Sequence, residues 1–229
     1  MTIRVVVVAA SLLFACGKGG DGNTKTVGEG DVVGFLKAAS PTDRARILAA
    51  AGVDSTPAAP AERTDLIARD GAPQTLLGNP PDVGDAAPAF ELRADGGEVV
   101  RLDDYRGKRL VLSVVPSIDT RVCEAQTHRM TDAEAQLPDG TALLTVSRDL
   151  PMAQQRFVED AQIKTSIASD FKGGGFGSGW GLAVKETGLL ARSVWIIDTD
   201  GRIAYRELVA NQATEPDYDA LLAALAGEP

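Results

Sequence analysis

The stretch RLVLSVVPSIDTRVC, residues 109–123, decides the fold of this chain. Residues 109–115 are almost entirely apolar and predict a buried strand, and residues 122–137 have the periodicity of a helix. Cys123 would then stand just after a strand, in the first turn of a helix, where unpaired N–H groups and the helix dipole favour the thiolate. This placement indicates a reaction centre. The alternative is a small buried cysteine that serves only in packing.

Strand and helix patterns continue to alternate downstream. Further strands are expected at residues 142–147, 165–168, 193–198 and 202–209, the last two as a hairpin. Further helices are expected at residues 152–161 and 218–225. Upstream, residues 64–69 and 73–77 flank Asp70-Gly71, which is a strong hairpin signal. Two strand–helix repeats followed by a hairpin and a terminal helix predict a mixed sheet covered on both faces, as in the thioredoxin-like α/β fold.

The first fifteen residues have the features of a signal peptide. Arg4 supplies a short positive start, and residues 5–14 form an apolar run that is too short to span a bilayer. Leu13-Phe14-Ala15-Cys16 resembles the lipobox of bacterial lipoproteins, in which the cysteine is lipidated and becomes the mature N-terminus. We therefore expect a lipid anchor on Cys16 and a periplasm-facing protein in a bacterial cell envelope, with the outer membrane as one compatible location. An ordinary secretory signal or a chance hydrophobic start are the alternatives.

The rest of the chain divides into a connecting segment and one domain. Residues 16–63 contain a polar, Gly-rich tether, two short amphipathic helices within 31–53, and an Ala/Pro linker. Residues 64–229 are expected to form the thioredoxin-like domain. The predicted domain division is therefore 1–15, 16–63 and 64–229.

Composition limits the classes of function. The net charge is −9 and no basic stretch exists to neutralise phosphates, so we expect no nucleic-acid partner. One histidine and two cysteines cannot build a typical structural zinc site, and we expect neither a metal nor a cofactor. If Cys16 carries lipid, Cys123 is the only free thiol of the mature chain. A lone thiol in an oxidising compartment favours redox chemistry over a structural disulfide.

Five short motifs occur in order along the chain. They are VGDAAP (83–88), PSIDTRVC (116–123), DLPMAQ (149–154), GLLAR (188–192) and TEPDY (214–218). Together they resemble the bacterial thiol peroxidase subfamily of the peroxiredoxins, over residues 64–225. The Asp-Thr-x-x-Cys element combined with the downstream Leu-Leu-Ala-Arg element is far more specific than a lone cysteine motif.

The resemblance implies roles for individual residues. Cys123 would be the peroxidatic cysteine, whose thiolate attacks a peroxide oxygen and becomes a sulfenic acid. The Thr120 hydroxyl would hydrogen-bond the peroxide, Arg192 would stabilise the developing charge, and Pro116 would shield the sulfur from water. Gln126 stands where a thioredoxin carries its second motif cysteine. It either bonds to active-site groups or is an ordinary helix residue.

One departure from the subfamily concerns the resolving cysteine. Val158 occupies the position at which two-cysteine thiol peroxidases carry it. We therefore expect a one-cysteine cycle in which an external thiol, either a thioredoxin-like protein or a low-molecular-weight thiol, reduces the sulfenic acid. Cys16 could take the resolving role only if it carries no lipid. By resemblance alone, a homodimer is expected.

The function predicted from the sequence is a membrane-tethered thiol peroxidase acting on hydrogen peroxide and organic hydroperoxides. The alternatives are a thiol-disulfide oxidoreductase or redox-sensing lipoprotein of the same fold, and a binding domain that has lost catalysis. Elsewhere, Arg129 is expected in a structural ion pair and Trp180 and Trp195 in packing. The Gly-rich segment 173–177 is expected to be a surface loop, with no helix opening there.

Overall fold

The computed structural model describes residues 60–94, 97–172 and 175–227. The signal peptide, the tether with its two short helices, and the lipidation site Cys16 lie outside these residues and stay predictions. Pro60–Pro229 form one compact unit. Within the described ranges, no helix has the length and apolar character needed to cross a bilayer.

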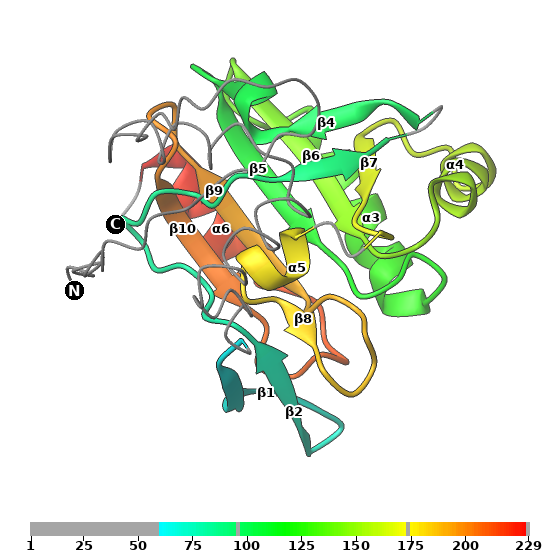
Figure 1. Cartoon of the computed structure of the whole chain (residues 1–229). Coiled ribbons are helices and arrows are strands. Elements are labelled where there is room, and N and C mark those ends of the chain that lie inside the picture. The colour runs from blue at the N-terminus through cyan, green and yellow to red at the C-terminus, as the bar shows by residue number, and fades with distance from the viewer. Residues whose placement is uncertain (1–59, 95–96, 173–174, 228–229) are drawn as a thin grey trace, which may run out of the picture. The chain divides into compact units, whose positions relative to one another are not determined.

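A seven-stranded mixed sheet forms the centre of the domain, in the order β10-β9-β5-β6-β7-β3-β4 (Figure 1). Strands β5, β6 and β7 are parallel, and the other pairs are antiparallel. The strands are β3 (Glu91–Arg93), β4 (Val99–Arg101), β5 (Arg109–Val114), β6 (Thr141–Ser147), β7 (Ser166–Ser169), β9 (Ser193–Ile197) and β10 (Ile203–Leu208). The mixed sheet of a thioredoxin-like fold is confirmed.

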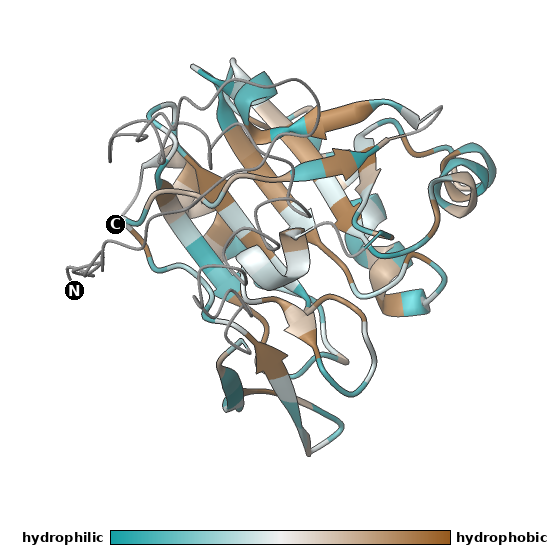
Figure 2. Cartoon of the chain, viewed as in Figure 1, coloured by the Kyte–Doolittle hydropathy of each residue, from teal (hydrophilic) through white to brown (hydrophobic). Residues whose placement is uncertain are grey.

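Alternation along β5 sends neighbouring side chains into two different cores. On one face, Val111 packs with residues of β6, β9 and two helices, α3 (Arg121–Glu134) and α6 (Tyr218–Ala226). On the other face, Leu110 and Leu112 pack against a second layer that contains β2 and the short helix α5 (Phe176–Gly179). Both faces are thus covered, which explains why β5 is largely apolar rather than alternating (Figure 2).

The helices match the predicted order with shifted ends. Helix α3 starts one residue earlier than expected and ends at Glu134, and α4 (Pro151–Asp160) carries proline at its first position, where the missing N–H costs nothing. Helix α6 ends at Ala226 and is capped by Gly227, whose φ of +77° suits a left-handed C-cap. A short 3₁₀ helix, η2 (Leu102–Tyr105), follows β4.

A small sheet of β1 (Glu62–Arg69), β2 (Ala72–Leu77) and β8 (Ala183–Val184) forms part of the second layer. Its turn residues Asp70 and Gly71 both have positive φ, at +50° and +82°. That combination is what a two-residue type I′ turn requires, and the predicted hairpin is confirmed.

An aromatic cluster fills the core beneath the second layer. The Trp180 ring stacks on Phe176 and meets Trp195 edge-on, with centroids 5.3 Å apart in both pairs. The packing predicted for the two tryptophans is confirmed. The surface loop expected at 173–177 is wrong for its described part, because α5 opens at Phe176 and buries that ring completely.

Candidate active site

Cys123 is the third residue of α3 and has no solvent-exposed surface. Thr120, in extended conformation, is the N-cap of this helix. The thiol is free and packs with Val115, Ile118 and the ring of Phe157 from α4. The cysteine therefore lies where the sequence predicted it, at the start of a helix after a buried strand, but with its sulfur covered.

Arg192 meets this sulfur from 69 residues further along the chain. Its Nη2 donates a hydrogen bond to Cys123 Sγ at 3.3 Å. The sheet register explains the approach, because Ser193, at the start of β9, pairs with Val114 at the end of β5. The residue before β9 and the loop after β5 consequently meet at one edge of the sheet. Arg192 as a whole is 2% exposed, so its charge acts on the sulfur with little screening by water.

The Arg192 guanidinium is fixed by bonds to three residues, of which Cys123 is one. Its Nε donates to the Gln212 carbonyl oxygen at 3.2 Å, and its Nη1 donates to Gln126 Oε1 at 2.7 Å. The Gln126 amide in turn donates to Ser113 Oγ of β5 at 2.9 Å. Gln126 thus bonds to the site, and the interpretation as an ordinary helix residue is wrong. Bound on every nitrogen, the guanidinium has one orientation, with one N–H aimed at sulfur.

Ser113 and Gln212 also bond within the site, although none of the five sequence motifs includes them. Gln212 is buried, accepts from the Arg192 backbone N–H at 2.5 Å through its side chain, and donates to the Val209 carbonyl oxygen at 2.6 Å. The only sequence signal for Gln212 is that it lies close to the TEPDY motif (214–218). A polar Ser113 within an otherwise apolar buried strand was a visible signal for a paired group.

Thr120 and Pro116 lie in the loop that leads to Cys123. Pro116 is buried directly after Val115. The Thr120 side chain is exposed, and its hydroxyl donates to the Ser117 carbonyl oxygen at 3.3 Å. The hydrogen bonds of the structure thus join Cys123 with Arg192 and Gln126, while Thr120 sits at the helix start with its hydroxyl turned to the loop.

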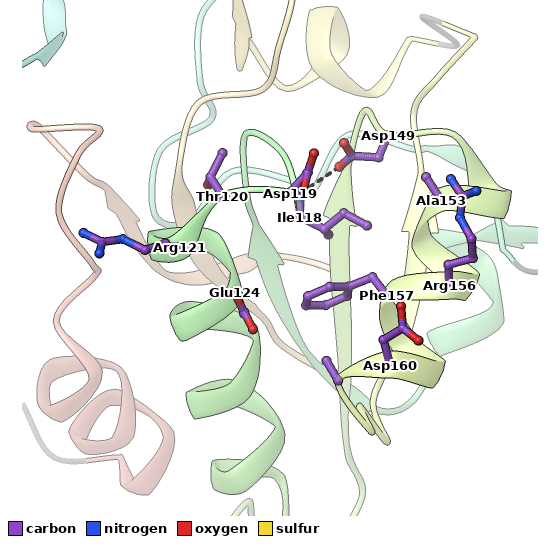
Figure 3. Close-up of a pocket in the computed structure, with 11 residues that line it drawn as sticks. Ile118, Asp119, Thr120, Arg121, Glu124, Asp149, Ala153, Arg156, Phe157 and Asp160 are labelled. Atoms are coloured by element: carbon purple, nitrogen blue, oxygen red, sulfur yellow. Dashed lines mark hydrogen bonds between the residues drawn. The ribbon is translucent and has the colours of Figure 1, made fainter.

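A pocket of about 580 Å³ opens between the start of α3 and α4 (Figure 3). Ile118 and Phe157 line it, and the same two side chains pack against Cys123. The sulfur therefore lies beneath this pocket and is separated from it by two apolar side chains. Within the described ranges, no three His, Cys, Asp or Glu side chains gather as a metal would need.

Arg129, further along α3, forms the structural ion pair that its position predicted. Its Nε lies 3.2 Å from Glu215, and its guanidinium lies 5.3 Å from the centre of the Tyr218 ring. Burial, followed by the hydrogen bond to Glu215, raises the pKa of the Tyr218 phenol well above its ordinary value. This cluster ties α3 to the start of α6.

Comparison with known proteins agrees with this geometry. The Redoxin family matches residues 82–222. A thiol peroxidase of Halalkalibacterium halodurans is 44% identical over 155 residues, which cover 67% of this chain and 93% of the relative. A thiol peroxidase of Bacillus subtilis is 41% identical over 150 residues, covering 65% and 89%. The crystal structure of a peroxiredoxin-like protein from Aquifex aeolicus has 32% identity and a TM-score of 0.67, and covers 72% of this chain and 98% of that one. The chain therefore belongs to the Redoxin family, as an oxidoreductase of the peroxiredoxin type.

Proposed function

We propose that this protein is a thiol-dependent peroxidase that reduces hydrogen peroxide and organic hydroperoxides through Cys123 as its peroxidatic cysteine. The contact of Arg192 Nη2 with Cys123 Sγ carries the proposal. A fixed cation against a buried sulfur at a helix start stabilises negative charge at the place where the nucleophilic thiolate reacts. The kinship with thiol peroxidases supports the same activity.

In the first half-reaction, the Cys123 thiolate attacks the terminal oxygen of the peroxide. A sulfur–oxygen bond forms and the oxygen–oxygen bond breaks, so that a sulfenic acid remains and the leaving oxygen takes a proton to become water or an alcohol. Arg192 stabilises the charge that shifts onto the oxygens as their bond stretches. Thr120, one turn before the cysteine, is the proposed hydrogen-bond partner of the bound peroxide, and Pro116 shields the sulfur.

In the second half-reaction, an external thiol reduces the sulfenic acid. The first thiol forms a mixed disulfide with Cys123 and releases water, and a second thiol releases Cys123 as a thiol and leaves as the disulfide. The proposal of a one-cysteine cycle is supported by the cysteine count, since the sequence contains only Cys16 and Cys123. Val158 stands on α4 where a resolving cysteine is expected by resemblance.

The test is peroxide consumption in the presence of excess small dithiol. Cys123→Ser is expected to abolish turnover, and Arg192→Ala to lower the rate constant for peroxide by about 10²–10³-fold, the usual effect of losing a donor to developing charge. Arg129→Ala is the matched control, because this arginine pairs with Glu215. Unchanged consumption in Cys123→Ser would contradict the proposal. Fast reduction of a disulfide substrate without peroxide turnover would favour a thiol-disulfide oxidoreductase instead.

The reducing cycle has its own readout. Mass spectrometry of the peroxide-treated full chain is expected to find Cys123 with one added oxygen, and as a mixed disulfide once a thiol is added. A disulfide between Cys123 and Cys16 would contradict the one-cysteine cycle.

We further propose that lipid on Cys16 anchors the protein to a membrane of the bacterial cell envelope, and that the protein is a homodimer. Labelling cells with a fatty-acid probe is expected to mark the wild type and to leave Cys16→Ser unlabelled. Equal labelling of both would contradict the anchor. Sedimentation of the soluble domain checks the dimer, and a single species of monomer mass would contradict it.

A further inference from the structure

The burial of Cys123 conflicts with the second half of the proposed cycle. Its sulfur has no exposed surface, and Ile118 and Phe157 separate it from the neighbouring pocket. A small peroxide needs little room, but a thiol must approach the sulfur in line with the bond that breaks. Reduction by a thiol therefore requires the segment before α3 to open, whereas the closed segment of this structure keeps the sulfur against Arg192, which stabilises charge in the peroxide reaction.

Asp149 binds this segment directly. Its Oδ1 accepts a hydrogen bond from Ser117 Oγ at 2.7 Å, and its Oδ2 accepts from the Ile118 backbone N–H at 2.9 Å. Figure 3 shows the Asp149 carboxylate at the rim of the pocket, where a dashed line marks its hydrogen bond to Ile118. Both donors belong to the loop Pro116–Thr120, which lies between the end of β5 and the start of α3. Hydrogen bonds to an ionised acceptor are roughly twice as strong as neutral ones.

The other contacts of Asp149 fix it to the body of the domain. Ser147 Oγ, at the end of β6, donates to Asp149 Oδ2 at 2.6 Å and itself accepts from the buried Gln154 amide of α4 at 2.8 Å. Ser169 Oγ, at the end of β7, donates to the Asp149 backbone carbonyl. The carboxylate is therefore anchored by the sheet and α4 while it holds the loop that carries the sulfur.

We propose that Asp149 is a positioning residue that holds the loop Pro116–Thr120 closed for reaction with peroxide, and thereby limits how readily the oxidised Cys123 meets its reducing thiol. The inference rests on the proposed one-cysteine cycle. A sulfenic acid that stays in the closed loop is exposed to a second peroxide, which would oxidise it to the sulfinic acid. Weakening the Asp149 hydrogen bonds should therefore favour reduction of the sulfenic acid over its further oxidation to the sulfinic acid.

The proposal predicts that the substitution Asp149→Asn changes the rates of the two half-reactions in opposite directions. Losing a charge-assisted hydrogen bond corresponds to about tenfold or more in the equilibrium between closed and open loop. While the closed form still dominates, the rate of sulfenic acid reduction by excess dithiol should rise about tenfold, and the rate constant for peroxide should fall less than twofold. The sulfinic fraction after a fixed number of turnovers should fall in parallel. Ser117→Ala, which removes one loop-side bond, should change each quantity in the same direction but less.

Two further measurements keep the test decisive. Asp198→Asn is the matched control, since this carboxylate accepts from Thr199 N–H and Arg109 at the opposite end of β9. Alkylation of reduced Cys123 by a bulky maleimide reports loop opening without any peroxidase turnover, and should also be about tenfold faster in Asp149→Asn. Rates of alkylation and of reduction within twofold of wild type, or a joint fall of both half-reactions, would overturn the proposal. Faster alkylation in a protein that never consumes peroxide would support the loop role and refute the proposed function instead.

Discussion

Replacing Gln126 by leucine tests whether the orientation of Arg192 governs the reaction. The two side chains have similar volume, so the substitution removes polar contacts with little change in packing. Gln126 is fully buried, its Oε1 accepts from Arg192 Nη1 at 2.7 Å, and its amide donates to Ser113 Oγ. In Gln126→Leu, the guanidinium keeps its bond to the Gln212 carbonyl oxygen and can rotate away from sulfur.

The size of the effect follows from the lost contacts. A hydrogen bond to a charged group contributes about 1.5–3 kcal/mol, which corresponds to about 10–100-fold in rate if it is felt entirely in the transition state. In Gln126→Leu, the guanidinium retains one of its two oxygen acceptors, the Gln212 carbonyl oxygen. We therefore expect the rate to fall by the lower end of this range, about tenfold. The unfolding free energy should fall by about 2 kcal/mol, because Arg192 Nη1 loses its buried acceptor.

The assay is the second-order rate constant of reduced protein with hydrogen peroxide, measured by rapid mixing, alongside urea unfolding. Gln155→Leu serves as control, because Gln155 is exposed on α4 and bonds only to Glu159 in the described structure. Gln126→Glu restores an acceptor for Arg192, so stability should recover, yet the rate should stay low because the added carboxylate neutralises the guanidinium that faces sulfur. A Gln126→Leu rate within twofold of wild type would refute the reasoning, and so would a Gln126→Glu variant as fast as wild type.

Three further predictions concern stability. Trp180→Ala should lower the unfolding free energy in urea by about 3–5 kcal/mol, because it empties the centre of the aromatic cluster and leaves the Pro88 carbonyl oxygen without its donor. Gly181→Ala should lower the thermal midpoint, since φ is +62° there and an added Cβ would overlap the backbone of the β2–β3 connection. Burial raises the pKa of all three tyrosines, so less than half of the phenol groups should be ionised at pH 10 in the folded protein. Stability should fall as the pH rises further, because the unfolded chain ionises first. Ionisation of Tyr105, Tyr205 and Tyr218 at the ordinary pKa before unfolding would contradict this.

Much of the fold could be predicted because the central strands are buried on both faces. Strands β5 and β6 are buried and largely apolar, and α4 opens at a proline, so their existence and order follow from local pattern. Helix α5 could not be found in this way. Phe176 is a single aromatic residue among glycines, and its burial depends on the distant Phe90 as well as on Trp180, which follows the same helix.

Only the site residues that lie in sequence motifs could be predicted. Cys123 follows from the strand–helix pattern, whereas Arg192 was found through resemblance, since no periodicity connects residues 69 apart. The bonds made by Gln212 and Asp149 depend on where two loops come to lie, which is a property of the sheet register. Local sequence has no information about such pairings unless a family motif supplies it.

The sheet register also explains why the two charged groups of the site do not interfere. Parallel β5 and β6 end at one edge, so Asp149 follows β6 beside the loop that follows β5, and antiparallel β9 starts at that edge with Arg192 before it. The cation lies against sulfur, where it stabilises negative charge, while three donors bind the Asp149 carboxylate. An anion turned toward sulfur instead would oppose the thiolate. Bound instead to the Ser117 hydroxyl and the Ile118 backbone N–H, the Asp149 carboxylate stabilises the closed loop. The charge of Arg192 therefore acts on the nucleophile, and the charge of Asp149 acts on the loop that positions it.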